Sequence, residues 1–155
     1  MNAKMENFQQ KVMYTSDYGV GKSKELKGIE MDAKMKNSLI VIETHVTARI
    51  DYSDIVYIEC RGRDTLVTTE RFELMIKRRM EDISSELEKN STMFCRMDKR
   101  RIINLEKVDY MMGGVIYLSN GREVRSSKSI YLKARKCYRE YISRGMLLAL
   151  ADGEC

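Results

Sequence analysis

Four basic residues stand close together in the stretch 93–105 and form its most distinctive chemistry. They are Arg96, Lys99, Arg100 and Arg101, and an apolar pair and Asn104 follow at once. Unpaired charges are costly to bury, so these side chains must project from a loop at the edge of a buried strand. A rigid strand that presents a cationic loop is the arrangement that a phosphate-rich partner requires.

The composition is that of a soluble globular protein with a basic balance. The chain has 155 residues, of which 43% are hydrophobic and 33% are charged, with a formal net charge of +5. This length predicts one domain and an additional arm. No apolar run approaches the ~18 residues of a membrane span, and no signal peptide opens the chain. We therefore expect a cytoplasmic protein with no membrane partner.

The cysteines and the one histidine are not arranged as metal ligands. Cys60, Cys95, Cys137 and Cys155 contain no CxxC pair, and His45 stands alone. Without clustered ligands we expect neither a metal site nor a cofactor. Reduced, packed thiols are the simpler interpretation. The alternative is a redox switch at Cys95, if neighbouring cations lower the pKa of its thiol.

Residues 1–36 differ from the rest of the chain and predict an N-terminal arm or linker. Polar and charged residues are mixed there with scattered apolar ones, and no helical or strand period is sustained. The triplet Gly21-Lys22-Ser23 resembles part of a phosphate-binding loop. That motif requires glycine five positions before Gly21, where Ser16 stands. A nucleotide site is therefore not expected.

From residue 38 the pattern becomes that of short strands separated by turns. Alternating or β-branched apolar residues predict strands at 39–42, 46–50, 55–58, 65–69, 72–76, 102–105, 108–112, 115–118 and 123–124. The Arg61-Gly62-Arg63-Asp64 segment predicts a hairpin with a basic tip. Asn120-Gly121 predicts a second hairpin, because both residues tolerate positive φ.

Two helices are expected among these strands. Met80, Ile83 and Leu87 recur at helical spacing, and Asn90 is a suitable end. A second apolar face runs from 130 to 141, with Gly145 predicted to end that helix and 146–155 to form a short C-terminal tail. The segment 37–145 is thus predicted to be one domain, mainly β with short helices.

The ordered set of landmarks resembles the LytTR DNA-binding domain. It consists of Ile55-Val56-Tyr57-Ile58-Glu59, a helix, Phe94-x-Arg96, Ile102-Ile103-Asn104-Leu105-x-x-Val108, Asn120-Gly121 and Ser127-Lys128. The resemblance covers about 100 residues, from roughly 38 to 142. It implies stacked, mostly antiparallel sheets whose loops enter successive major grooves at direct-repeat promoter sites. An enzyme is not expected, because the sequence has one histidine, no visible nucleophile–base pair and no glycine-rich phosphate cradle.

When the family's DNA-contacting positions are transferred to this sequence, the resemblance implies three DNA-facing loops. The first is the hairpin tip with Arg61, Arg63 and Asp64. The second places Lys99 and Arg100 at base-facing positions before Asn104. The third, after the last strand, carries Lys128. These are the basic loops that charge and turn chemistry indicate independently.

Some residues depart from the family pattern. Where the family commonly has His, a basic residue, Ser and an aromatic residue, this chain has Asp98, Lys99, Arg100 and Arg101. Asp98 would repel phosphate unless it accepts a hydrogen bond from cytosine N4 or pairs with a neighbouring arginine. Asn104 is interpreted as a structural residue that satisfies the strand end.

The family most often follows a receiver domain, and only about 36 residues precede the domain here. The chain is therefore either a free-standing regulator or a fragment of a longer protein. We expect a sequence-specific transcriptional regulator that binds promoter DNA, as a homodimer on that DNA or with a partner signalling protein. The alternative is a protein-interaction module of the same fold that does not bind DNA.

Overall fold

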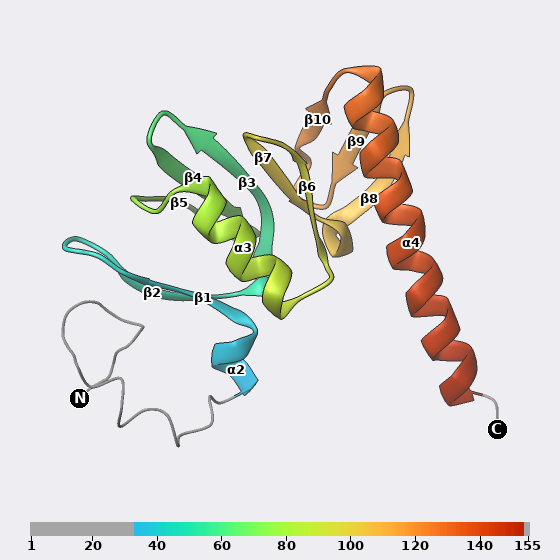
Figure 1. The fold of residues 1–155 in the computed structure, drawn as a ribbon, viewed down its shortest axis with the longest axis horizontal. Helices are drawn as coiled ribbons and strands as arrows, with labels where there is room; N and C mark the ends of the chain where they lie inside the picture. The colour runs from blue at the N-terminus through green and yellow to red at the C-terminus, as the bar shows by residue number, and fades with distance from the viewer. Residues whose placement is uncertain (1–32, 154–155) are drawn as a thin grey trace. The chain divides into compact units, whose positions relative to one another are not determined.

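The computed structural model describes residues 33–153, and it divides the chain into two compact units, Met1–Tyr52 and Ser53–Cys155 (Figure 1). The predicted arm lies almost wholly outside the described residues, as do the Gly21-Lys22-Ser23 triplet and Cys155. The predicted domain 37–145 spans parts of both units, and its boundaries stay a prediction. No helix among residues 33–153 is long and apolar enough to cross a membrane.

The described part of the first unit is a short helix and a β-hairpin. The helix α2 (Ala33–Lys36) precedes β1 (Ser38–Ile42), which pairs antiparallel with β2 (Thr47–Asp51). The turn is closed by two backbone hydrogen bonds between Glu43 and Val46. The two predicted strands are confirmed, and the histidine of this turn is exposed.

The second unit contains a five-stranded antiparallel sheet in the order β5-β4-β3-β7-β6. Its strands are β3 (Ile55–Arg61), β4 (Asp64–Thr69), β5 (Glu73–Ile76), β6 (Phe94–Asp98) and β7 (Arg101–Asn104). A 3-10 turn, η1 (Tyr52–Asp54), leads into β3. The first four residues of the central strand β3 are buried, which explains its continuous apolar run.

A three-stranded antiparallel sheet follows, in the order β10-β9-β8. The 3-10 turn η2 (Leu105–Lys107) leads from β7 into β8 (Val108–Met112), and β9 (Val115–Leu118) and β10 (Glu123–Arg125) complete the sheet. Gly121 has φ +88° in the turn between β9 and β10, as the Asn-Gly pair predicts. The expectation of a mainly β fold with mostly antiparallel sheets is confirmed.

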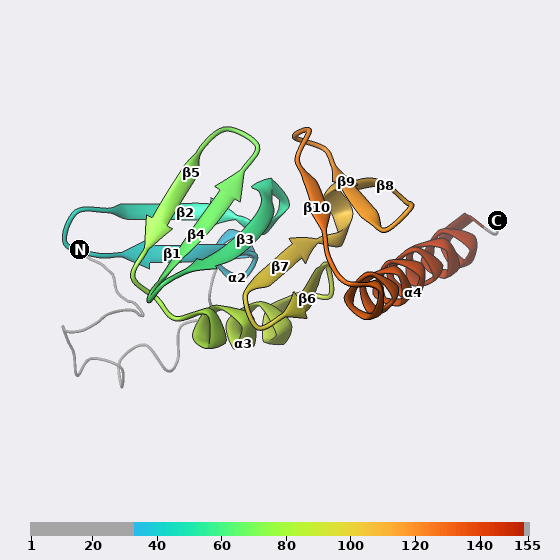
Figure 2. The same ribbon diagram turned by 90° about the horizontal axis from the view of Figure 1, so that it is seen from above.

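Two longer helices flank the β6–β7 hairpin. The helix α3 (Met80–Asn90) begins and ends as predicted, and α4 (Lys128–Gly153) follows β10. Figures 1 and 2 both show the hairpin between these helices. The predicted helix end at Gly145 is wrong, because α4 continues to Gly153. Gly145 has no positive φ, and the Met, Leu and Ala residues after it are strong helix formers that outweigh its cost of about 1 kcal/mol.

One hydrophobic core joins both sheets of the second unit to α4. Its buried members come from β3, β6, β7, η2, β8, β9, β10 and α4: Val56, Tyr57, Cys95, Met97, Ile103, Leu105, Val108, Ile116, Leu118, Val124 and Ala134. Ala134 is fully buried, which lets α4 approach the strands closely. Apolar burial therefore fixes the second unit as one body from which its loops project.

Polar contacts reinforce the junction of the two sheets. The Arg122 guanidinium, from the turn after β9, lies 4.5 Å from the ring centroid of Tyr57 on β3. Glu70, in the turn after β4, accepts from Lys107 Nζ at 3.0 Å and from Ser119 Oγ at 2.9 Å. Cation–π and charged hydrogen bonds of this kind hold the relative position of the sheets.

Candidate nucleic-acid interface

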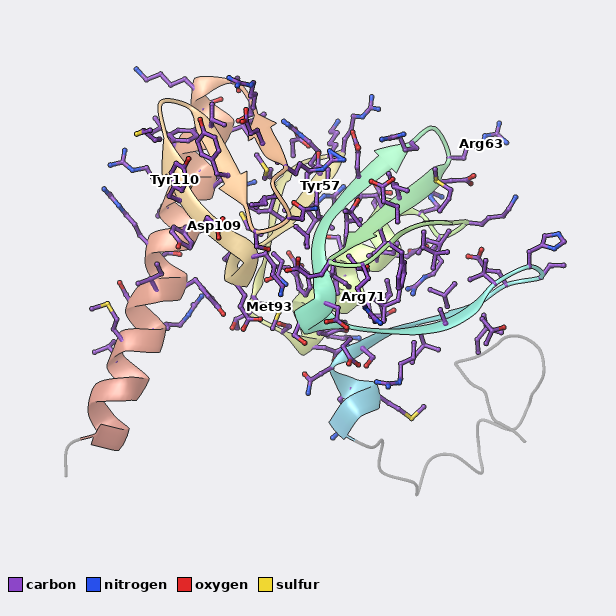
Figure 3. The ribbon with its side chains drawn as sticks, turned by 180° about the vertical axis from the view of Figure 1, so that it is seen from behind. Tyr57, Arg63, Arg71, Met93, Asp109 and Tyr110 are labelled. Atoms are coloured by element: carbon purple, nitrogen blue, oxygen red, sulfur yellow. The ribbon has the colours of Figure 1, made fainter. Side chains whose placement is uncertain are left out.

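The first predicted loop is the tight turn between β3 and β4. Gly62 has φ +66°, a conformation that glycine adopts without strain, so the hairpin can reverse in two residues. Arg61 Nη2 lies 3.2 Å from Glu59 Oε1, so its charge is partly matched within the hairpin. Arg63 is exposed and extends away from the tip (Figure 3). The half-buried Asp64 lies at the start of β4, opposite Arg61 in the backbone register of the two strands.

The second loop is the turn between β6 and β7, which exposes Lys99 and Arg100. The side chain of Arg96 holds the backbone of this turn. Its Nε donates to the carbonyl of Asp98 at 3.1 Å, and its Nη2 donates to the carbonyl of Lys99 at 3.0 Å. Arg96 also lies 3.5 Å from Glu81 on α3. Arg96 therefore acts as a structural group that holds the turn, while the side chains of Lys99 and Arg100 face solvent.

Asp98 closes the same turn and pairs with Arg101. Its Oδ1 accepts from the Arg100 backbone N–H at 2.9 Å, and its Oδ2 accepts from Arg101 Nε at 3.1 Å and Nη2 at 2.7 Å. Partial burial on its own raises the pKa of Asp98, but these hydrogen bonds outweigh it and hold the pKa below its ordinary value. The carboxylate is thus charged and locally neutralised, which answers the objection that it would repel phosphate.

The third loop leads from β10 into α4. The Ser127 hydroxyl accepts weakly from the Ile130 N–H at 3.4 Å, as a helix-capping serine does, and Lys128 is the first helical residue. The first turn of α4 contains no acidic residue, whereas α3 begins with Glu81 and Asp82. The positive end of the α4 dipole is therefore uncompensated and adds to the charge of Lys128.

Hydrogen bonds join the three loops along one edge of the second unit. The Cys60 N–H, at the end of β3, donates to the Arg100 carbonyl at 2.8 Å. Arg101 Nη1 donates to the carbonyl of Arg125, the last residue of β10, at 2.8 Å. Figure 1 shows all three connections at its upper edge. The geometry therefore brings together the basic segments that the sequence singled out separately.

Exposure and pairing divide the six predicted site residues. The side chains of Arg63, Lys99 and Lys128 are exposed and form no ion pair or hydrogen bond with any other residue in 33–153. Arg61 is paired with Glu59. Arg100 Nη2 reaches the Cys60 carbonyl only at 3.5 Å. Asp64 is the one acidic member of the set. Three unpaired cations from three different turns therefore face solvent at this edge.

A family model described as "LytTr DNA-binding domain" matches residues 45–138. The chain belongs to the LytTR family. Among solved structures, it resembles the LytTr DNA-binding domain of a Bacillus cereus protein assigned as a methyl-accepting/DNA response regulator. That match has a TM-score of 0.54 at 20% identity and covers 65% of this chain and 95% of the other. No curated protein matches the chain.

The LytTR Asn at the end of β7 is structural here, as predicted. Asn104 is fully buried, its Nδ2 donates to the Ile55 carbonyl at 2.7 Å, and its Oδ1 accepts from the Glu106 N–H at 2.9 Å. It therefore joins β7 to β3 and caps η2. Its side chain has no surface to present to a base.

The redox alternative at Cys95 rests on a wrong expectation. The thiol does not lie among the cations of the loop but points into the core, where its residue is 3% exposed. Burial, together with a hydrogen bond to Cys137, raises the pKa of Cys95 to about 12. The thiol is therefore protonated near neutral pH and is a poor nucleophile. Alternation along β6 decides this, because the basic residue Arg96 and the thiol point to opposite faces.

The contact between Arg101 and the Arg125 carbonyl is a structural feature of the candidate interface that the sequence does not predict. The two residues are 24 positions apart, and each stands beside several other charged residues. Nothing in the spacing signals which guanidinium supports the loops and which faces solvent. The one indication in the sequence is Arg101 itself, a basic residue that stands before the apolar pair where the LytTR family usually has an aromatic residue.

Proposed function

We propose that this LytTR chain is a transcriptional regulator that binds promoter DNA in a sequence-specific manner. The observation that carries the proposal is the alignment of three basic turns along one edge, with unpaired cations at Arg63, Lys99 and Lys128. Lysine and arginine on such loops neutralise phosphates and release counterions. Tight turns of this kind are narrow enough to enter a major groove about 12 Å wide.

The residue types suggest a division of work between phosphate and base contacts. Arg63 and Arg100 carry planar guanidinium groups that suit O6 and N7 of guanine, with ~1–3 kcal/mol of discrimination for a good bidentate contact. Lys99 is a compact charge that serves either a guanine or a phosphate. Lys128, beside the uncompensated end of the α4 dipole, suits a phosphate. We propose that Asp64, as the acidic member of the set, accepts a hydrogen bond from cytosine N4.

The alternative function is a protein-interaction module that has lost DNA binding. One support for it in the sequence is Asp98, which stands where the family commonly has histidine. The Asp98 carboxylate is taken up by Arg101 and by the Arg100 N–H. The cationic edge is therefore not opposed by a free acidic group at this position, and the DNA-binding function is favoured.

Selection of duplexes from a random library by the full chain tests the proposal. A selected duplex and its scrambled counterpart are then titrated by fluorescence anisotropy at several salt concentrations. We expect tighter binding of the selected duplex, with affinity falling steeply as salt rises for both. No binding of any duplex at low salt would overturn the proposal and favour the protein-interaction module.

The arrangement of sites and partners forms part of the same proposal. Binding to direct repeats places two copies on one face of the duplex when the repeats are one helical turn apart, at 10–10.5 bp. Footprints of the selected sequences would show one or two protected segments. Two protected segments at that spacing support binding of two copies.

A further inference from the structure

We propose that Asp98 and Arg101 form a positioning brace that sets the second and third loops in register and so determines DNA specificity. The inference rests on the proposed function, since it assigns roles to residues within the same interface. Neither residue is proposed to touch a base. They act through the loops that do.

The brace is built from one carboxylate and one guanidinium. Arg101 uses Nε and Nη2 for a two-point pair with Asp98 Oδ2, at 3.1 and 2.7 Å. Its Nη1 faces the other way and donates to the Arg125 carbonyl at 2.8 Å. A guanidinium is rigid and planar, so these donors cannot move independently. The turn after β6 and the strand end before α4 are therefore held at a fixed separation.

Asp98 also shapes the turn that carries the candidate contacts. Its second oxygen accepts from the Arg100 N–H at 2.9 Å, and the carbonyls of Asp98 and Lys99 accept from Arg96. The Lys99-Arg100 pair thus sits on a turn whose backbone is held by hydrogen bonds from both sides. The brace is partly shielded, with the Arg101 and Asp98 side chains only 20% and 26% exposed. Such burial strengthens the pair relative to a surface ion pair.

A brace and a simple charge make opposite predictions for Asp98. If the carboxylate acts only through its charge, its removal favours binding of every duplex, because a repulsive group next to the DNA is lost. If it positions the loops, its removal lowers affinity for the selected sequence while binding of a scrambled duplex holds or increases. The sign of the change for the selected duplex therefore separates the two roles.

The test uses three variants of the full chain and two duplexes, one selected by the wild-type protein and one scrambled. Asp98→Asn removes the negative charge of the Asp98–Arg101 pair. Arg101→Lys keeps the net charge but lacks the planar fork. Glu123→Gln is the matched control, since it also removes one negative charge near the third loop, where Glu123 lies 2.8 Å from Arg125, and leaves the brace intact.

For Asp98→Asn and Arg101→Lys we expect the affinity for the selected duplex to fall about tenfold, comparable to the loss of one good base contact, while that for the scrambled duplex holds or increases. For Glu123→Gln we expect equal changes for both duplexes. An unchanged ratio of the two affinities in both brace variants, despite retained folding by circular dichroism, would overturn the brace. Failure of the wild-type chain to bind any duplex would instead count against the proposed function. If one brace variant does not fold, the other decides.

Discussion

Asn104 Nδ2 lies 2.7 Å from the carbonyl oxygen of Ile55, a hydrogen bond inside the core between residues 49 positions apart. This bond satisfies a carbonyl at the start of β3, where the pairing with β4 is irregular between Ile55 and Tyr57. An irregular ladder leaves backbone groups to be satisfied by side chains. The fully buried amide supplies this contact and holds β7 against β3, on whose far ends two of the candidate loops are carried.

Replacement of Asn104 by Ala should therefore destabilise the fold. The change leaves a buried carbonyl without its amide donor and removes the cap on η2, at a combined cost of about 2–4 kcal/mol in the free energy of unfolding. Urea unfolding monitored by circular dichroism measures this loss. Asn120→Ala is the control, since Asn120 is exposed and only caps its own turn. Similar losses for the two variants would contradict the structural role of Asn104.

Neutralisation of the second loop should weaken DNA binding with little effect on stability. Lys99→Ala and Arg100→Ala each remove an exposed side chain, so we expect changes in unfolding free energy within about 0.5 kcal/mol. Affinity for a selected duplex should fall in both variants, and more for Arg100 if its guanidinium reads a guanine. Lys89→Ala, an exposed lysine at the end of α3, serves as the control. Unchanged affinity in both loop variants would show that this loop does not face DNA.

The junction between the sheets should weaken in acid through Glu70. Its hydrogen bonds from Lys107 and Ser119 lower the pKa of this carboxyl from its ordinary value of 4.5. A folded-state pKa below the unfolded one stabilises the fold above the unfolded value, and that stability is lost as pH falls through the folded value. Glu70→Gln should therefore lower Tm at pH 7, and its difference from wild type should shrink below pH 4.5. Glu88→Gln, an exposed carboxyl on α3, should show no such trend.

The strands and the loops were predictable because their signals are local. Alternation and apolar runs identify the strands other than β6, which was not predicted, and Gly62 and Gly121 stand where the hairpins need positive φ. The three basic turns follow from the same local signals, because charged residues between two apolar runs must lie on a turn. The end of α4 was not predictable from Gly145, because the helix formers after it decide whether the helix continues.

The pairing of charges was not predictable, because it depends on tertiary contacts. Arg63 and Arg101 each stand within one residue of an acid or another base in the sequence, yet one is unpaired and the other is held by two partners. The environment of Cys95 was misjudged for a related reason. Sequence neighbours suggested cations around the thiol, whereas strand alternation and α4 place it in the core.

The thiols should differ in reactivity according to their burial. Iodoacetamide should modify the half-buried Cys60 in the native protein and reach Cys95 only after unfolding, because only the thiolate reacts and burial raises the pKa of Cys95 to about 12. Peptide mass spectrometry after timed alkylation, with and without urea, gives the two rates. Modification of Cys95 at the rate of Cys60 in native protein would mean that the core opens readily.

Basic residues on α4 should contribute to DNA binding in a graded manner along the helix. Figure 1 shows α4 leading away from the edge that carries the three loops. Lys128 begins the helix at that edge, whereas Arg139, also exposed and without an ion pair among residues 33–153, lies about 16 Å further along at 1.5 Å per residue. This separation exceeds the ~8 Å Debye length at physiological ionic strength.

Lys128→Gln should therefore reduce the slope of log affinity against log salt by about 0.9, the value for one phosphate contact, and it should do so for selected and scrambled duplexes alike. Arg139→Gln should leave the slope unchanged, although it removes the same charge from the same helix. Equal reductions in the two variants would mean that the duplex lies along α4 and not across the edge formed by the loops. A loss of affinity only for the selected duplex in Lys128→Gln would instead assign Lys128 to a base contact, because phosphate contacts do not distinguish sequences.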